Sequence, residues 1–283
     1  MAESPAGQLV FVTTPIGNAR DITLRALDVL RAADVLVAED TRTLRRLLEI
    51  HGVPLSGRPL YAYHDHSGDR DRARVRGALE QGLMVAYASE AGTPLIADPG
   101  YGLIAAAREV SATITATPGV SAAITALSLS GLPTDQFHFY GFLPSSKGAR
   151  CKALEGLRPV PGTLVFYESP NRIGKALQDM ANTLGPNRAA ALCRELTKKF
   201  EEVVTGTLAD LVTRSATATW KGEIVVLVGA EGAVEPDALD VDEALETALR
   251  DQSVKDAVAV VTEATGLPRR QIYQRALEIL KDR

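Results

Sequence analysis

The sequence of 283 residues predicts an α/β fold, and three observations carry that prediction. Short apolar runs rich in β-branched residues recur along the chain, which is the pattern of buried strands. Amphipathic segments of about a dozen residues separate these runs, and this length suits helices that cross over a parallel sheet. Hydrophobic residues make up 46% and charged residues 23% of the chain, the balance of a protein that buries sizeable cores.

The first α/β domain is predicted over residues 1–117, because the seam between two sets of strands falls near residues 112–120. Within this domain the amphipathic segment at 22–32, ITLRALDVLRA, is predicted to form a helix. The predicted strands are QLVFV at 8–12, DVLVA at 34–38 and LMVAYA at 83–88.

A second α/β domain is predicted over residues 118–234, with a helix at 173–184 and strands at 163–167, 189–193 and 223–229. An acidic, turn-rich linker at 231–240 then leads into a helical unit that spans 235–283. Its last two helices are joined by the turn GLP, which is the spacing of a helix-turn-helix pair. The side chains expected to form its core are Val258, Val261, Leu267, Ile272, Leu277 and Leu280.

Composition excludes several classes of protein. No apolar run approaches the ~20 residues that cross a bilayer, and no basic segment precedes an apolar one at the N-terminus, so we expect a cytoplasmic protein. The two cysteines and four histidines show no metal-binding spacing, so no metal site is predicted. The net charge of −4 means that an RNA partner would be met by local basic patches.

The loops that follow the predicted strands are rich in turn residues and in charged side chains. TTPIGN at 13–18 combines a stiffening proline with a glycine that permits close backbone approach, although an ordinary β-to-α turn has the same composition. AEDTR at 38–42 places carboxylates where a strand stops. SEAGTPLIADPGYG at 89–102 contains a formal dinucleotide-binding glycine pattern, but it starts too far beyond the strand to favour NAD.

Taken together and in order, these segments resemble a known family. The motifs TPIGN, AEDTR, AGTPLI, DPG, SGLP, GFLP, FYE, RELTK and KGEIV are similar to those of the bacterial ribosomal RNA small subunit methyltransferase I family. That family belongs to the tetrapyrrole (corrin/porphyrin) methylase superfamily. The resemblance covers residues 9–280, and the sequence departs from the usual motifs at Glu90, where Asp is usual, and at Asn171, where His is usual.

The resemblance implies two tetrapyrrole-methylase-type α/β domains with a donor cleft between them, and S-adenosyl-L-methionine as the methyl donor. It also implies 2'-O-methylation of a cytidine in the decoding region of 16S rRNA, within the 30S subunit, by a homodimer. The positions that match the donor-binding segments are Pro15, Ile16, Gly17, Asn18, Ser89, Glu90, Ala91, Gly92, Thr93, Pro94, Ser121, Ala122, Phe166, Tyr167 and Glu168.

A ribose 2'-hydroxyl is a poor acid, so a base or a cation near it should assist methyl transfer. The sequence offers four candidates, His66, Lys198, Glu39 and Asp40, and does not choose among them. A surface ion-pair ladder is the alternative interpretation of Lys198, because glutamates flank it.

Basic side chains near the predicted site and on the last helix are candidates for RNA contact. They are Arg20, Arg42, Arg45, Arg46, Lys147, Arg150, Arg269 and Arg270. Two other functions remain open at this stage. A methyltransferase of the same superfamily acting on a small, tetrapyrrole-type molecule is one, and a non-catalytic RNA-binding or assembly module is the other.

Overall fold

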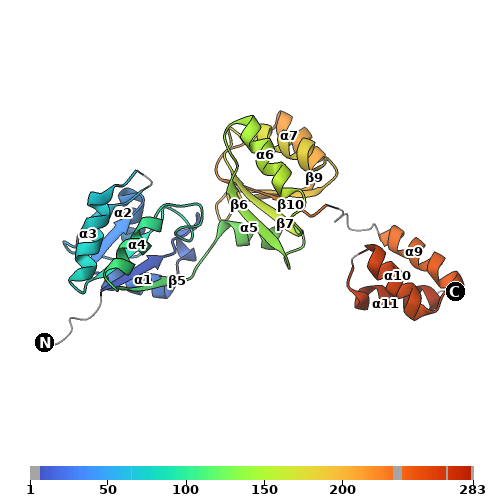
Figure 1. Ribbon diagram of the computed structural model, residues 1–283, viewed down its shortest axis with the longest axis horizontal. Helices are drawn as coiled ribbons and strands as arrows, with labels where there is room; N and C mark the ends of the chain where they lie inside the picture. Colours follow the sequence, from blue (N-terminus) through green and yellow to red (C-terminus); the bar gives the residue numbers. More distant parts are fainter. Residues whose placement is uncertain (1–6, 65, 232–237, 266, 282–283) are drawn as a thin grey trace. The chain divides into compact units, whose positions relative to one another are not determined.

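The computed structural model describes residues 7–64, 66–231, 238–265 and 267–281. The chain separates into two compact units, Met1–Glu231 and Gly232–Arg283. The larger unit contains two five-stranded sheets, and the smaller one is helical (Figure 1). Among the described residues, no helix combines the length and the apolar character needed to cross a bilayer.

The first sheet is entirely parallel and has the strand order β3-β2-β4-β1-β5. One face packs on α1 and α2 through residues such as Leu30 and Leu44, and the other packs on α3 and α4 through Leu79 and Leu103. The elements are β1 (Gln8–Val12), α1 (Leu24–Ala32), β2 (Val35–Ala38), α2 (Thr41–Ile50), β3 (Leu60–Ala62), α3 (Asp69–Glu80), β4 (Met84–Ala88), α4 (Tyr101–Glu109) and β5 (Thr113–Thr117), with a 3₁₀ turn at Ala19–Asp21.

The second sheet has the order β6-β7-β10-β8-β9, and only its β6–β7 pair is parallel. The expectation of a parallel sheet is therefore wrong for this half. Helices α6, α7 and α8 cover one face, and α5 covers the other (Figure 1). The elements are α5 (Ala122–Ser130), β6 (Phe137–Phe142), α6 (Lys147–Leu157), β7 (Thr163–Glu168), α7 (Ile173–Leu184), β8 (Ala189–Arg194), β9 (Glu202–Thr207), α8 (Leu208–Thr217) and β10 (Ile224–Val228).

The smaller unit consists of α9 (Ala238–Asp251), α10 (Val254–Thr265) and α11 (Arg269–Lys281). Its core contains Val258, Val261 and Ile272 as predicted. Leu277 and Leu280 were wrongly assigned to this core, since they are 46% and 39% exposed on α11. Gly266 of the predicted turn and most of the predicted linker lie outside the described residues.

A buried ion pair braces the second sheet. Nη2 of Arg150 on α6 lies 2.6 Å from Oδ2 of Asp179 on α7, and both side chains are 6% exposed. Nη1 of Arg150 also donates to the carbonyl oxygens of Pro144 and Ser145, in the loop after β6. Arg150 is therefore not a surface contact for RNA, because its guanidinium is consumed inside the fold.

We expect Asp179→Ala to lower the free energy of unfolding by about 3–5 kcal/mol, because the variant leaves the Arg150 guanidinium buried without its counter-charge. Chemical denaturation measures this change. Arg31→Ala is the control, since it breaks an exposed ion pair with Asp28 that contributes little. Equal effects of the two variants would show that the buried pair does not brace the sheet.

Candidate functional site

Two loops at the carboxyl edge of the first sheet are joined backbone to backbone. The N–H groups of Thr14 and Gly92 each donate to the other residue's carbonyl oxygen at 3.0 Å. Gly92 has φ +80°, a conformation that side-chain-bearing residues rarely adopt. The hydroxyl of Thr93 donates to the carbonyl oxygen of Val120, so the loop before α5 is tied to the same assembly.

The TPIGN loop also packs against the second half of the unit. The N–H of Asn18 donates to Oγ1 of Thr197 at 3.0 Å. A Cβ atom on Gly17 would lie only 2.5 Å from Cγ of Lys198, so this position needs glycine for contact with the protein rather than with a ligand. Glu195 and Thr197 have φ of +50° and +64°, which marks the RELTK turn as a strained backbone segment.

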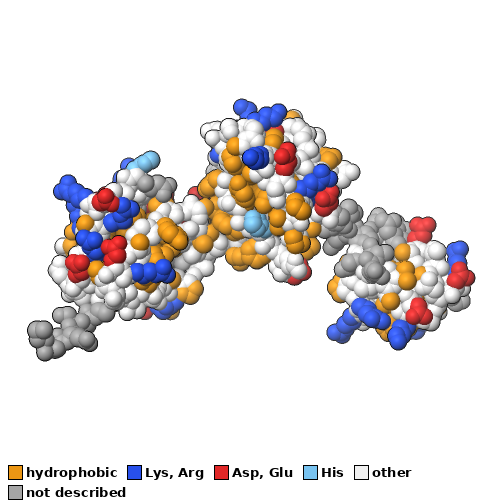
Figure 2. All heavy atoms as spheres, in the orientation of Figure 1, with side chains coloured by type: hydrophobic (Ala, Val, Ile, Leu, Met, Phe, Trp, Pro, Cys, Tyr) orange, Lys and Arg blue, Asp and Glu red, His pale blue; other side chains and the backbone are white. Residues whose placement is uncertain are grey.

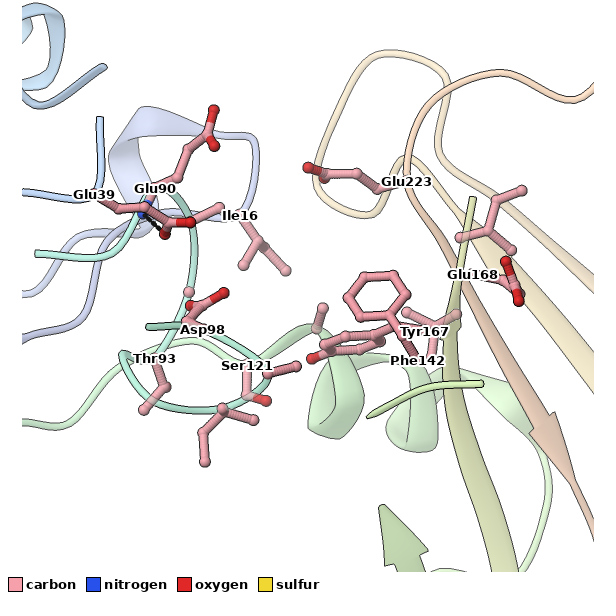
Figure 3. A pocket seen from close by; sticks show the side chains of 17 residues that line it. Ile16, Glu39, Glu90, Thr93, Asp98, Ser121, Phe142, Tyr167, Glu168 and Glu223 are labelled. Atoms are coloured by element: carbon pink, nitrogen blue, oxygen red, sulfur yellow. Dashed lines mark hydrogen bonds between the residues drawn. The ribbon is translucent and has the colours of Figure 1, made fainter. Parts of the chain in front are cut away.

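A cavity of about 290 Å³ opens where these loops face the second sheet. Figure 3 shows that its wall is drawn from both sheets, with Glu39, Glu90 and Asp98 on one side and Phe142, Tyr167 and Glu223 on the other. Its size is near the lower end of the range typical of small-molecule sites. The lining residues are Ile16, Glu39, Glu90, Ala91, Gly92, Thr93, Ile96, Ala97, Asp98, Ser121, Ala122, Phe142, Tyr167, Glu168, Glu223, Ile224 and Val225.

The cavity wall is acidic, and among its described lining residues there is no lysine or arginine. Oε2 of Glu39 accepts a hydrogen bond from the N–H of Glu90 at 3.1 Å, which fixes the two loops against each other. Burial raises the pKa of Glu90, and the carboxylates of Glu39, Asp40 and Glu223 raise it further. Such a wall favours a cationic ligand, which would relieve the repulsion among these carboxylates.

The opposite wall is aromatic. The rings of Phe142 and Tyr167 meet edge to face with centroids 5.6 Å apart. Burial raises the pKa of Tyr167, although hydrogen bonds with the Ala123 backbone and the Ser121 side chain act in the other direction. The tyrosine is therefore a neutral hydrogen-bonding group at neutral pH.

A strained loop closes one side of the cavity. Leu95 and Ala97 both have positive φ, +73° and +63°, on either side of Ile96. This backbone turns Ile96 outward, where its side chain is 42% exposed and lines the cavity. Left-handed conformations of this kind persist where the surrounding structure imposes them, and they are frequent at functional sites.

The structure brings many of the predicted donor-binding positions to one place. Ile16, Glu90, Ala91, Gly92, Thr93, Ser121, Ala122, Tyr167 and Glu168 line the cavity, while Pro15, Gly17, Asn18, Ser89, Pro94 and Phe166 do not. Phe166 is fully buried in the core beneath α6 and α7, because adjacent residues of β7 face opposite sides of the sheet. Whether the lining residues contact a donor stays a prediction.

Glu168 is on that same buried face of β7. Its side chain is fully shielded and lies 3.0 Å from Nη2 of Arg172, while its Oε2 accepts from the N–H of Ser169. Burial raises the pKa of Glu168, and these partners oppose the rise. The carboxylate is thus part of the support behind the cavity rather than of its open space, as Figure 3 also shows.

Of the four candidate bases, Glu39 lines the cavity and the other three do not. His66 is exposed, and its backbone N–H donates a hydrogen bond to Nδ1 of His64. Hydrogen bonds from the side chain and backbone of Arg42 hold the pKa of Asp40 at about 2, because Asp40 caps α2. Asp40 is therefore a poor proton acceptor.

Lys198 is an ion-pair residue. Its Nζ lies 2.8 Å from Oε1 of Glu195 and 2.9 Å from Oε2 of Glu223. Burial would lower the pKa of Lys198, but these two carboxylates outweigh burial and raise it above its ordinary value. The amine is protonated at neutral pH, so it cannot act as a base and can only act as a cation.

The remaining basic candidates are exposed. Figure 2 shows cationic side chains over the part of the larger unit that carries α2 and α3. The side chain of Arg42 is 89% exposed even though it pairs with Asp40. The exposed candidates are Arg20, Arg42, Arg45, Arg46, Lys147, Arg269 and Arg270.

Several lining residues were missed by sequence reasoning. Glu223 stands directly before an apolar strand in KGEIV, and Asp98 stands in DPG, so a carboxylate at a strand end or in a turn was the available signal. Phe142 carried no such signal, because an aromatic residue at the end of a strand usually packs in a core. The others are Ile96, Ala97, Ile224 and Val225.

Comparisons with known proteins agree with this architecture. Residues 8–212 match the family described as tetrapyrrole (corrin/porphyrin) methylases, and residues 235–280 match the RsmI C-terminal HTH domain. The chain is 45% identical to the ribosomal RNA small subunit methyltransferase I of Mesorhizobium japonicum, over 97% of this chain and 92% of the relative. It is 43% identical to the protein of the same name from Vibrio cholerae, over 96% and 95%.

The fold is also that of a solved structure. The uroporphyrin-III C-methyltransferase of Thermus thermophilus, complexed with S-adenyl homocysteine, superposes with a TM-score of 0.54 at 19% identity. The match covers 78% of this chain and 97% of the other.

Proposed function

We propose the function of this chain from one premise: it belongs to the tetrapyrrole (corrin/porphyrin) methylase family. It is an S-adenosylmethionine-dependent methyltransferase that acts on small-subunit ribosomal RNA, as its relatives are named to do. We propose further that the methyl acceptor is the ribose 2'-oxygen of a cytidine in the decoding region of 16S rRNA.

The observation that carries the proposal is the charge of the cavity. Glu39, Glu90, Asp98 and Glu223 line it, without a lysine or arginine among the described lining residues, and of these four Glu223 is paired with Lys198 from outside the lining. S-adenosylmethionine supplies a methyl group on a positively charged sulfur, so a carboxylate-lined wall fits it. The same wall favours that donor over its demethylated product, whose sulfur is neutral, and this difference helps product leave.

The protein's part in methyl transfer is chiefly positioning. The sulfur–methyl bond breaks as the bond between the methyl carbon and the 2'-oxygen forms, and the hydroxyl proton passes to a base. Glu39 is the residue we assign to this proton, because it lines the cavity and a carboxylate has several acceptor sites beyond the one used by Glu90. Removing a general base typically costs about 10²- to 10⁴-fold in rate.

The phosphates of the RNA are bound outside the cavity, because the acidic wall repels them. We assign this contact to the exposed arginines of α2, Arg42, Arg45 and Arg46, next to Glu39 in sequence. Arg269 and Arg270 at the start of α11 form a second basic site, on the helical unit. The substrate is proposed to be the 30S subunit, in the cytoplasm.

We also propose a homodimer. Ile124 and Leu129 on α5 and Phe137 on β6 are 45–50% exposed, and Figure 2 shows apolar side chains gathered over this part of the larger unit. Exposed apolar patches of this sort commonly mark protein–protein contacts.

The central experiment is transfer of a tritiated methyl group to 30S subunits that lack the modification, followed by mapping of the labelled nucleotide. Label on the ribose of one cytidine supports the proposal, and label on a base rejects the 2'-oxygen as acceptor. Calorimetry with S-adenosylmethionine separates an enzyme from a non-catalytic RNA-binding module. Transfer to a tetrapyrrole but not to subunits would support the small-molecule alternative.

We expect Gly92→Val to weaken S-adenosylmethionine binding about 10-fold or more. Valine at φ +80° is strained, and its Cβ would press on Ile16, whose Cγ2 lies 3.3 Å away in the cavity wall. Isothermal titration calorimetry measures the effect. Gly156→Val on α6 is the control, because nothing lies within 4 Å of that position. Unaltered affinity in Gly92→Val would remove this loop from the donor site.

Donor affinity should fall as pH is lowered, because protonation removes negative charge from the wall. The raised pKa of Glu90 starts this loss at a higher pH than an ordinary glutamate would. Glu90→Gln should therefore bind S-adenosylmethionine about fivefold more weakly near neutral pH and depend less on pH. Glu49→Gln on α2, outside the lining, is the control. If S-adenosylhomocysteine loses as much affinity as the donor, the charge argument is wrong.

Removal of residues 237–283 should leave donor binding intact and raise the Michaelis constant for 30S subunits. The double variant Arg269→Glu, Arg270→Glu should do the same and flatten the salt dependence of binding, because two phosphate contacts are lost. Methylation assays at several salt concentrations measure both effects. A Michaelis constant equal to that of the intact protein would mean that the helical unit does not bind the subunit.

A further inference from the structure

Strand β6 contains a bulge immediately before the cavity. Phe139 pairs with Val165 of β7, and the next pair is Gly141 with Phe166, so Tyr140 is an extra residue on β6. Gly141 has φ +81°, a conformation for which glycine is suited. Bulges of this type change the direction in which the following side chains point.

The bulge turns Phe142 into the cavity. In a regular strand, residues 139 and 142 would face opposite sides of the sheet. With the bulge, both rings contact Tyr167, at centroid distances of 4.9 and 5.6 Å. Phe142 is 53% exposed and lines the cavity, so a large apolar ring is held toward solvent where burial would be more favourable.

Two arginines donate hydrogen bonds to the backbone that follows Phe142. Nη2 of Arg172 donates to the carbonyl oxygen of Leu143 at 2.5 Å. Arg150, buried against Asp179, donates to the carbonyl oxygens of Pro144 and Ser145. These hydrogen bonds from two arginines hold the segment next to Phe142 in place. The position of the exposed ring is therefore determined by the fold.

A nucleotide whose base has left its helical stack can bring its 2'-hydroxyl to a donor inside the cavity, and unstacked bases are the usual targets of sequence-specific RNA recognition. An unstacked base needs a replacement partner, and an exposed aromatic ring is the usual one. We propose that Phe142 is the platform on which the target cytosine stacks, and hence a positioning residue for methyl transfer; this rests on the proposed function.

The position of the Phe142 ring favours stacking of the target cytosine on it over stacking of the donor's adenine. Ile16 and Val225 supply apolar lining that is already buried, at 6% and 4% exposure, and suits a ligand that fills the cavity itself. Phe142 is half exposed, and Figure 3 shows it over Tyr167, across from Glu39 and Glu90. This ring is therefore accessible to a group that arrives from solvent.

The test combines two measurements on the full-length protein. An oligoribonucleotide with the fluorescent base pyrrolocytidine at the target position reports stacking through quenching. Methylation of 30S subunits reports the Michaelis constant and the turnover number separately. Phe142→Ala should abolish the quenching and raise the Michaelis constant about 5- to 150-fold, with donor affinity unchanged by calorimetry. Phe142→Tyr should restore both, because it keeps the ring.

Tyr101→Ala is the matched control, since Tyr101 at the start of α4 is 83% exposed and does not line the cavity. If Phe142→Ala weakens donor binding and leaves quenching intact, the ring serves the adenine and the proposal is overturned. Unaltered quenching and Michaelis constant overturn it as well. Failure of the wild-type protein to methylate subunits would reject the proposed function, whereas the quenching result would still decide whether Phe142 stacks a base.

Discussion

The cavity depends on the contact between the TPIGN loop and the RELTK turn. The backbone at Gly17 approaches Lys198 so closely that a Cβ atom would overlap it, and Asn18 donates to Thr197 at the same place. Since the cavity wall is drawn from both sheets, this contact determines whether Glu39 and Glu223 face one space or two. The strained φ angles of Glu195 and Thr197 are maintained by the ion pairs of Lys198 and by Glu201, whose Oε2 accepts from the N–H of Thr197.

Negative and positive side chains lie in different places, the negative ones where the donor is proposed to bind and the positive ones where RNA is proposed to bind. Carboxylates gather in the cavity, where a cationic donor fits, and exposed arginines gather on α2 and at the start of α11. This separation reconciles a net charge of −4 with a nucleic acid substrate, because phosphates need only meet local cationic surface. Arg150 shows that basic residues are not interchangeable in this respect, since its partner is Asp179 and not RNA.

The second sheet acts as a support for the cavity. Its buried face holds Glu168, Arg172, Arg150 and Asp179 in contact with one another or with the loop after β6. The face that packs on α5 presents Tyr167 and Phe142 to the cavity. A sheet of this kind can place aromatic side chains with more precision than a loop, because neighbouring strands fix the backbone on both sides.

Much of the fold followed from local sequence, because buried strands need continuous apolar runs and turns need glycine and proline. The strand at 8–12 and the helix at 173–184 lie as predicted. Sequence analysis did not predict four strands that are short or partly exposed, namely β3, β5, β6 and β9. The loops of the site were also identifiable from their turn residues and carboxylates. Tertiary structure alone decided which of their side chains face the cavity.

Three comparisons show why. Phe166 and Tyr167 are neighbours, yet strand register sends one into the core and the other to the cavity. Arg150 is buried because Asp179 lies opposite it on another helix, 29 residues away in sequence. Phe142 reaches the cavity only because one extra residue in β6 changes its direction. The sequence by itself determined which elements form and what chemistry their ends carry; pairing, register and long-range contacts, which no local pattern encodes, decided the site.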